Sequence, residues 1–429
     1  MTKWSIFEVL SMSDSSLLAS RSFVLIGILG ILCAFDAMSI DMYLPAFPAI
    51  QQDIGADAAG MQTSLSVFLI GLALGQLVYG PLIDRYGRKG PLLLGIVLFS
   101  ISSLLIAHAS TLSWFVFFRL MQGLGGAAGL VIPRAIVADL YSERDAAKVF
   151  SLLMQVMAIA PIIAPPLGGV LLGTLGWSAI FWVLTFVGML MLFATWRCVP
   201  ESLPRRDRTR GGMLSALTGY AVLLRQKKFM GYTLSGSFVM GGLFTYIGAS
   251  AFIFIEYFHL SPTTYSYIFA SNALGMVLLG QINIFLLNRW REYQILPIGI
   301  ALHVAGGVAL CGVLLAGITS LWIITGLIFL TMSFLSLVFG NGVAVAMNAA
   351  PGQTGSASSL LGVLQYVFGG VAGVIMGIVH DGTLLPPVML LTVYAIGALL
   401  SWWYAWRQTD TDAMENALTD NRTPEREGS

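Results

Sequence analysis

About twelve long apolar stretches constrain this chain more than any other feature of its sequence. Each has close to the roughly 20 residues that an α-helix needs to cross a bilayer. Membrane β-strands are only about 9–11 residues long, and lipid offers backbone groups no hydrogen-bond partner, so helices are the spanning element. We expect an all-α integral membrane protein. The predicted spans are 22–46, 62–82, 91–110, 114–137, 149–173, 178–197, 229–252, 266–287, 295–316, 320–344, 357–379 and 386–406.

The composition supports a membrane protein and excludes several other classes. Hydrophobic residues make up 57% of the chain and charged residues only 10%, whereas about 25% of a soluble domain is charged. A net charge of +1 gives no sign of nucleic-acid binding. The 3 cysteines lie in or beside predicted helices, so no disulfide framework is indicated.

Positive charge fixes the predicted orientation. Outside the spans, lysine and arginine occur at the N-terminus and on the connections that follow even-numbered helices. Because positive residues stay on the cytoplasmic side, both termini are expected to be cytoplasmic. Two arginines, Arg119 and Arg134, fall inside the fourth predicted span and are not explained by this rule.

The longest connection divides the chain into two halves. Residues 198–228 form a basic linker, expected to be cytoplasmic, between an N-terminal six-helix half at 1–197 and a C-terminal six-helix half at 229–406. The polar tail at 407–429 is expected to be cytoplasmic and to lack structure. Two six-helix halves that face a midplane cavity are typical of transporters.

Ionisable residues inside the spans are the first candidates for function, because each costs roughly 2.5–3.5 kcal/mol to insert. Asp41 and Arg119 are expected at similar depth, which permits an ion pair. A carboxylate that is alternately paired and desolvated changes its proton affinity, as a proton-coupled carrier requires; a static salt bridge is the alternative. Asp36 lies about 140° around the helix from Asp41. It is expected either to line the cavity or to hydrogen-bond a neighbouring helix.

The connection after the second span carries the most specific local pattern. Its charged side chains can bridge the ends of neighbouring helices, and Asp139 is the expected partner of Arg88. A solvated, positively charged turn is the alternative. The candidate gate residues are Gly80, Asp84, Arg85, Gly87, Arg88, Lys89 and Asp139.

These patterns resemble the major facilitator superfamily. The Gly80–Lys89 turn is similar to that family's G-x-L-x-D-R-x-G-R-K signature, and Arg119–Gly123 resembles the R-x-x-Q-G element of drug:proton antiporters. Ala164–Gly169 resembles the antiporter motif G-P-x-x-G-G, with alanine in place of the first glycine. Asp41–Pro45 and Gly355–Leu360 look like the Bcr/CflA drug-resistance subfamily. Asp36 is not part of that pattern.

The antiporter motif agrees with helix physics. Pro165 and Pro166 remove backbone donors and bend the helix, while Gly168 and Gly169 let a neighbouring helix approach closely. The resemblance implies a seal against ion leak; ordinary helix packing is the alternative.

Polar and aromatic residues at plausible cavity depth are candidates for substrate contact, although many of them are expected only to pack. These candidates are Tyr43, Gln122, Tyr246, Asn272, Gln365, Tyr366 and Phe368.

The resemblance implies a carrier of the bacterial inner membrane that exports small amphipathic drugs, such as chloramphenicol-, bicyclomycin- or sulfonamide-like compounds, in exchange for protons. Export of a metabolite such as a nucleoside or amino acid is the alternative. The chain carries no G-x-x-x-x-G-K-[ST], H-E-x-x-H or G-x-S-x-G motif, so we expect neither ATP hydrolysis nor an enzyme. The expected partners are substrate, protons and lipid, with no cofactor or metal, and the chain is expected to be monomeric.

Overall fold

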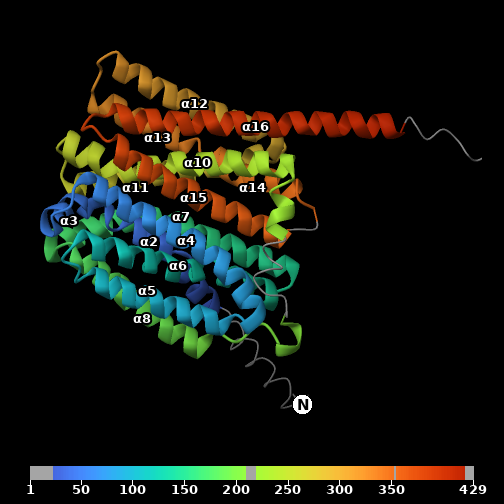
Figure 1. The fold of residues 1–429 in the computed structure, drawn as a ribbon, viewed down its shortest axis with the longest axis horizontal. Helices are drawn as coiled ribbons and strands as arrows, with labels where there is room; N and C mark the ends of the chain where they lie inside the picture. Colours follow the sequence, from blue (N-terminus) through green and yellow to red (C-terminus); the bar gives the residue numbers. More distant parts are fainter. Residues whose placement is uncertain (1–22, 209–218, 352–353, 421–429) are drawn as a thin grey trace, which may run out of the picture. The chain divides into compact units, whose positions relative to one another are not determined.

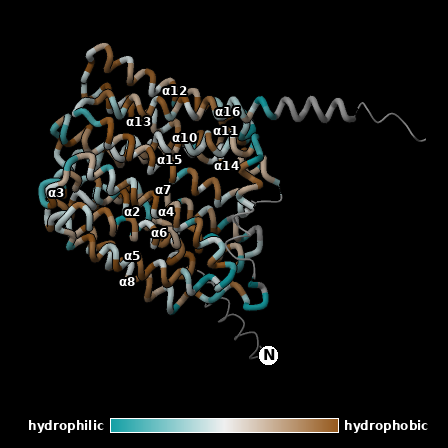
Figure 2. Tube along the Cα trace, in the orientation of Figure 1, coloured by the Kyte–Doolittle hydropathy of each residue, from teal (hydrophilic) through white to brown (hydrophobic). Residues whose placement is uncertain are grey.

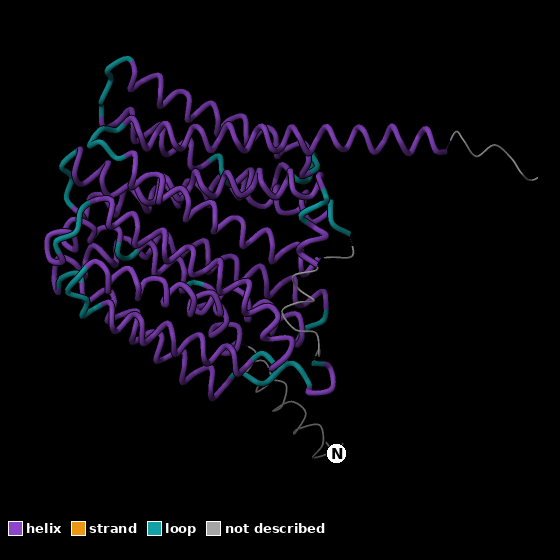
Figure 3. The backbone as a smooth tube through the Cα atoms, viewed as in Figure 1, coloured by secondary structure: helices purple, strands orange, loops and turns teal. Residues whose placement is uncertain are grey.

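The computed structural model describes residues 23–208, 219–351 and 354–420, and helices account for almost all of them (Figure 3). No strand occurs in these ranges. In the described residues, 12 helices are long and apolar enough to cross a membrane by length and composition. The predicted number of spans and the all-α fold class are therefore confirmed. Figure 2 shows hydrophobic residues along the helices and hydrophilic residues mainly at their ends.

The helices follow the predicted spans closely (Figure 1). The first span, Phe23–Ile54, is interrupted and contains α2, a 3₁₀ turn and α3. The labelled helices are α2 (Phe35–Asp41), α3 (Phe47–Ile54), α4 (Ala58–Tyr86), α5 (Lys89–Ile106), α6 (Leu112–Leu140), α7 (Glu143–Leu175), α8 (Ser178–Cys198), α10 (Lys227–Ala251), α11 (Pro262–Leu286), α12 (Glu292–Leu315), α13 (Leu321–Ser333), α14 (Ser336–Asn348), α15 (Thr354–Val379) and α16 (Leu385–Asp420).

The chain forms two compact units. Unit 1 comprises Met1–Asp57, Val67–Met213 and Pro262–Ala270. Unit 2 comprises Ala58–Ser66, Leu214–Ser261 and Ser271–Ser429. The main division falls within the predicted linker, and α4 and α11 each contribute to both units. The division into functional halves at the boundaries given above stays a prediction.

Small residues allow close helix packing inside unit 1. Helix α5 packs against α6 and α8, and α2 packs against α7 and α6. A Cβ built on Gly125 of α6 would lie 2.5 Å from the backbone nitrogen of Phe99 in α5, so these backbones approach too closely for any larger residue. This packing places the polar side chains described below.

Unit 2 is built around α10, which packs against α14, α15 and α16. The first turns of α4 belong to this unit, and Gln62 Nε2 donates a 2.7 Å hydrogen bond to the carbonyl oxygen of Gly248 in α10. Helix α10 ends in a π-helical segment, Phe252–Tyr257. The tenth predicted span consists of α13 and α14, which are separated by Phe334 and Leu335.

The C-terminal segment differs from the expectation for 407–429. Helix α16 continues to Asp420, beyond the end of its membrane-spanning stretch at Gln408. The physical reason is local composition, because alanine, methionine, leucine and glutamate all favour helix. Residues 421–429 lie outside the described residues.

Candidate functional site: buried and half-buried charge in unit 1

A fully buried arginine lies inside unit 1. Arg119 of α6 has no exposed surface and is the largest fully buried side chain in the described chain. Its Nη1 donates to the carbonyl oxygen of Ser39, 3.1 Å away, and to Oε1 of Gln122, 2.6 Å away. The guanidinium carbon lies 4.2 Å from the ring centroids of both Tyr43 and Phe68. Each cation–π contact of this kind contributes about 0.5–2 kcal/mol.

Gln122 extends this network to another helix. Its Nε2 donates to the hydroxyl of Ser103 in α5, 2.8 Å away. The guanidinium of Arg119 is therefore held by the first span, α4 and α6, and α5 supports it through Gln122. Nε and Nη2 of Arg119 form no hydrogen bond of good geometry in the described part of the chain.

The expected ion pair between Asp41 and Arg119 is not formed. Both residues are buried at the expected common level, since Arg119 contacts the backbone of Ser39. No ion pair, however, joins them among the described residues. The reason is helical rotation: the ring of Tyr43 packs on the guanidinium, and Asp41, two residues earlier, lies about 160° around the helix from Tyr43. Asp36 is buried and lies within electrostatic reach of Asp41.

The antiporter-like motif of α7 lies directly against this region. A Cβ on Gly168 would collide with the carbonyl oxygen of Met42, the residue after Asp41. A Cβ on Gly169 would lie 2.8 Å from Oγ of Ser266, in the part of α11 that belongs to unit 1. Pro165 and Pro166 both lie inside the helix. The expected close approach to neighbouring helices is present at both glycines.

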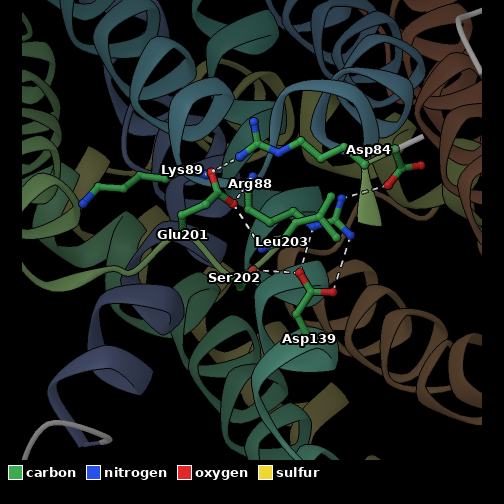
Figure 4. Close-up of polar contacts among 8 residues, drawn as sticks. Asp84, Arg88, Lys89, Asp139, Glu201, Ser202 and Leu203 are labelled. Carbon is green, nitrogen blue, oxygen red and sulfur yellow. Dashed lines mark hydrogen bonds and ion pairs between the residues drawn. The ribbon is translucent and has the colours of Figure 1, made fainter. Parts of the chain in front are cut away.

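A second cluster lies where α4 meets α5, as Figure 4 shows. Arg88 donates from Nη1 to Asp84, 2.8 Å away, and from Nε to Asp139, 2.9 Å away. The contact between Arg88 and Asp139 confirms the predicted pairing. Burial alone would lower the pKa of the Arg88 guanidinium, but its hydrogen bonds to Asp139 and Asp84 raise that pKa above its usual value. Arg88 therefore stays charged.

Two residues of the following linker complete this cluster, and sequence reasoning missed both. Glu201 accepts hydrogen bonds from the backbone nitrogens of Arg88 at 2.8 Å and Lys89 at 3.4 Å. Ser202 donates to Asp139 over 2.7 Å. The only available signal was that Glu201 is one of two acidic residues, with Asp207, in a mostly basic linker. We call Asp84, Arg88, Asp139, Glu201 and Ser202 the α4–α5 cluster.

The other predicted gate residues have different surroundings. Gly87 has a φ of +92°, and a Cβ there would collide with Glu201, so this position requires glycine. Gly80 lies inside α4 with open space around it, so no close contact there requires glycine. Arg85 lies over the ring of Tyr86 at 5.3 Å, and Nζ of Lys89 donates to the carbonyl oxygen of Trp196.

The candidate substrate residues fall into two groups, one in each unit. Tyr43 and Gln122 have no exposed surface and support Arg119. In unit 2, Asn272 donates to the hydroxyl of Tyr246, and both are buried. The remaining three are on α15 and are half-buried: Gln365, Tyr366 and Phe368. A role of these residues in substrate binding stays a prediction.

Comparison with known proteins identifies relatives over most of the chain. The Major Facilitator Superfamily profile matches residues 29–374. The uncharacterized MFS-type transporter YdgK of Bacillus subtilis is 34% identical over 88% of this chain and 94% of its own length. A bicyclomycin resistance protein homolog of Haemophilus influenzae is 27% identical, over 89% and 96%. A chloramphenicol resistance protein of Pseudomonas aeruginosa is 31% identical, over 83% and 82%.

Solved structures show the same fold. The crystal structure of a D-xylose-proton symporter aligns with a TM-score of 0.72, covering 90% of this chain and 97% of that one, at 15% sequence identity. At that identity the likeness concerns the fold alone.

The contact of Gly168 with Met42 predicts a position-specific glycine requirement. Gly168→Ala forces α7 and the first span apart, so transport should fall at least about tenfold and stability should drop by about 1–3 kcal/mol, as overpacking does. Gly173→Ala is the matched control, because a Cβ on Gly173, also in α7, meets nothing within 4 Å. Transport assays and thermal unfolding in detergent measure both effects. Equal behaviour of the two variants would contradict the requirement.

The two carboxylate partners of Arg88 should differ in their contribution to stability. The side chain of Asp139 is 19% exposed, whereas that of Asp84 is 53% exposed. Asp139→Asn should therefore cost about 1–3 kcal/mol, and Asp84→Asn less than about 1 kcal/mol, as exposed pairs do. Thermal unfolding of the two purified variants tests this order. A larger loss in Asp84→Asn would show that burial does not govern the cluster.

Glu201 forms an ion pair with Arg208, 3.5 Å away, and also accepts hydrogen bonds from the start of α5. We expect the hydrogen bonds to matter more for transport than this ion pair. Glu201→Gln keeps one acceptor oxygen and should retain most of the transport rate, while Glu201→Ala leaves the amides of Arg88 and Lys89 without that acceptor and should slow transport about tenfold. Initial rates in membrane vesicles separate the two variants. If Glu201→Gln is as slow as Glu201→Ala, charge and not the acceptor geometry is what matters.

Proposed function

The chain belongs to the major facilitator superfamily and is a membrane transporter of small molecules, and we propose that it exports small amphipathic drugs in exchange for protons. Relatives with bicyclomycin- and chloramphenicol-resistance names support drug export. Proton exchange and the chloramphenicol- or bicyclomycin-like substrate class are our proposal for this chain.

The burial of Asp41 is the observation that carries the proton-coupling proposal. This carboxyl is 4% exposed and lies within a membrane span, beside the close contact between Gly168 and Met42. In the described residues it has neither an ion-pair partner nor a hydrogen-bond partner. A carboxyl that alternates between buried and solvated positions takes up and releases a proton, because burial disfavours the charged form. Asp41 is thus our coupling carboxyl.

Arg119 and Asp36 assist Asp41 in this proposal. Arg119 keeps its charge and needs compensating partners, which the carbonyl of Ser39 and the side chain of Gln122 supply. Its role is to fix the first span and to set the local potential, not to neutralise Asp41 directly. Asp36 is a second buried carboxyl on the same span and lies within electrostatic reach of Asp41.

The α4–α5 cluster is proposed as a latch on the cytoplasmic side. Its ion pairs join the ends of α4, α5 and α6, and hydrogen bonds of Glu201 and Ser202 connect these ends to the linker after α8. A latch biases the population of conformations without contacting the substrate. We infer an inner-membrane location with both termini in the cytoplasm, because the basic connections then lie on the cytoplasmic side.

Replacement of Asp41 tests the coupling directly. In proteoliposomes with an imposed pH gradient, uphill transport of radiolabelled chloramphenicol should fall to background in Asp41→Asn, while exchange down its concentration gradient persists. Substrate-driven proton release from purified protein should also vanish. Asp145→Asn is the control, because Asp145 is an exposed carboxylate paired with Lys148.

The possible outcomes separate the alternatives. Normal proton release in Asp41→Asn, combined with loss in Asp36→Asn, would move the coupling role to Asp36. A substrate panel that includes nucleosides and amino acids distinguishes drug export from metabolite export. Wild-type protein that transports metabolites but none of the drugs would overturn the drug-export proposal.

A further inference from the structure

Unit 2 contains an apolar groove of about 290 Å³ between α15 and α16, which we call the α15–α16 groove. Helix α10 lies between these two helices and packs against both (Figure 1), whereas α15 and α16 make few contacts with each other. Phe238 of α10, Val371 of α15 and Val393 of α16 are among the lining residues. The one polar side-chain group in the lining is the hydroxyl of Tyr394, which donates to the carbonyl oxygen of Phe368, 3.3 Å away. The groove therefore suits a hydrocarbon chain better than a polar ligand.

An exposed apolar stripe on α16 leads from this groove to the end of the membrane-spanning stretch. Val393, Ile396, Leu400 and Trp403 are all exposed, and they follow one another at intervals of three or four residues, which places them on one face of the helix. Arg407 comes four residues after Trp403 and is also exposed. Its guanidinium carbon lies 3.8 Å from the centroid of the Trp403 ring. The stripe thus ends at a tryptophan and a cation, as is typical of the membrane interface.

Helix α10 brings a second cation to the same end of unit 2. Ser235 donates to the carbonyl oxygen of Ala398, and a Cβ on Gly231 would lie 2.7 Å from Cβ of Ala405. The two helices are therefore antiparallel, and the first turn of α10 lies beside the last turn of the α16 span. Lys227 is the first residue of α10 and is exposed. It forms no ion pair with any residue that the structure describes.

Both cations lie on the helix faces that line the groove. At about 100° per residue, Lys227 is about 20° around α10 from Phe238, and Arg407 is about 40° around α16 from Val393. Along the helix axes these separations are about 17 Å and about 21 Å. One leaflet contributes about 15 Å, half of the roughly 30 Å hydrocarbon core, and long basic side chains extend toward the headgroups. A single lipid therefore spans the distance from the cations to the groove.

The charge around the two cations favours an anion. Helices α10 and α15 contain no aspartate or glutamate, and neither does α16 as far as Gln408. The acidic residues of α16 begin at Asp410, beyond the membrane-spanning stretch. Lys228, next to Lys227, adds a further positive charge. Lipid phosphate with a net negative charge complements this end of unit 2.

We propose that unit 2 binds one anionic phospholipid, with its phosphate held by Lys227 and Arg407 and an acyl chain in the α15–α16 groove. The site is independent of what the chain transports, because it needs only the bilayer in which the protein lies. The guanidinium of Arg407, held over Trp403, offers several donors in one plane to phosphate oxygens. Phe368 then contacts lipid and not substrate.

Native mass spectrometry of the purified full-length protein tests the headgroup contact. Dioleoyl phosphatidylglycerol is anionic, and dioleoyl phosphatidylcholine has the same acyl chains but no net charge. Each basic residue near an anionic headgroup strengthens binding about fivefold, so the wild-type protein should bind the anionic lipid at least about tenfold more tightly. The double variant Lys227→Gln, Arg407→Gln should reduce this preference to within about twofold. Arg289→Gln is the control, because it removes an exposed arginine between α11 and α12 and should keep the preference.

A second pair of variants tests the groove. Val371→Trp places an indole in the groove from α15, and Ile378→Trp places one on the same helix face beyond the groove. Both original side chains are exposed, so both variants should fold, and equal melting temperatures without added lipid verify this. Val371→Trp should weaken the binding of both lipids by the same factor, at least about threefold, because the acyl chain loses its packing contacts. Ile378→Trp should bind both lipids as the wild-type protein does.

Several results would overturn the lipid site. Equal affinity of the wild-type protein for the two lipids, or a preference that survives in the double variant, would remove the headgroup contact. Unchanged binding in Val371→Trp would remove the acyl chain from the groove. Displacement of phosphatidylglycerol by inorganic phosphate would show a site for a free anion. Displacement by chloramphenicol would make the groove a drug site, and a dimer that Val371→Trp dissociates would make a second copy of the chain the occupant.

Discussion

The burial of a permanently charged guanidinium at Arg119 is the constraint on which the geometry of unit 1 depends. An isolated ion in a low-dielectric interior costs many kcal/mol, and an arginine cannot escape this cost by losing its proton. Here the charge is distributed over one carbonyl, one amide oxygen and two aromatic faces. These partners come from the first span, α4 and α6, so none of these segments can shift independently without exposing the charge to an apolar environment.

Arg88 is also a buried guanidinium, but ion pairs with carboxylates balance its charge, whereas Arg119 has neutral partners. This difference affects which contacts can break during movement. Arg88 is paired with two carboxylates, and Asp84 is largely exposed. Water can replace Asp84 at low cost, because exposed ion pairs contribute only about 0.2–1 kcal/mol. The pair with Asp84 is thus suited to open and close within a transport cycle, whereas the pair with the more buried Asp139 costs more to break. The contacts of Arg119, which water does not reach, are suited to hold their arrangement throughout it.

The sequence predicts the spans well because their signal is local: a run of apolar residues needs only its own length to cross a bilayer. It also predicts the contact between Arg88 and Asp139, because opposite charges at helix ends have few other partners. The pairing of Asp41 with Arg119 was wrong since depth along an axis says nothing about rotation around it. Glu201 was missed because two of its partners are the backbone amides of Arg88 and Lys89, which carry no residue-specific signal.

Three features of unit 1 meet along the interface between the first span and α7, and they give the proposed exchange of drug for protons a physical basis. An apolar groove of about 250 Å³ lies between the first span and α7, and Met42 is both one of its lining residues and the backbone contact of Gly168. Asp41 is the residue before Met42. A molecule that wedges this groove apart strains the contact of Gly168 with Met42, and the backbone that carries Asp41 must move with it. Coupling then needs no direct contact between substrate and carboxyl, because each ligand biases the separation of the same two helices.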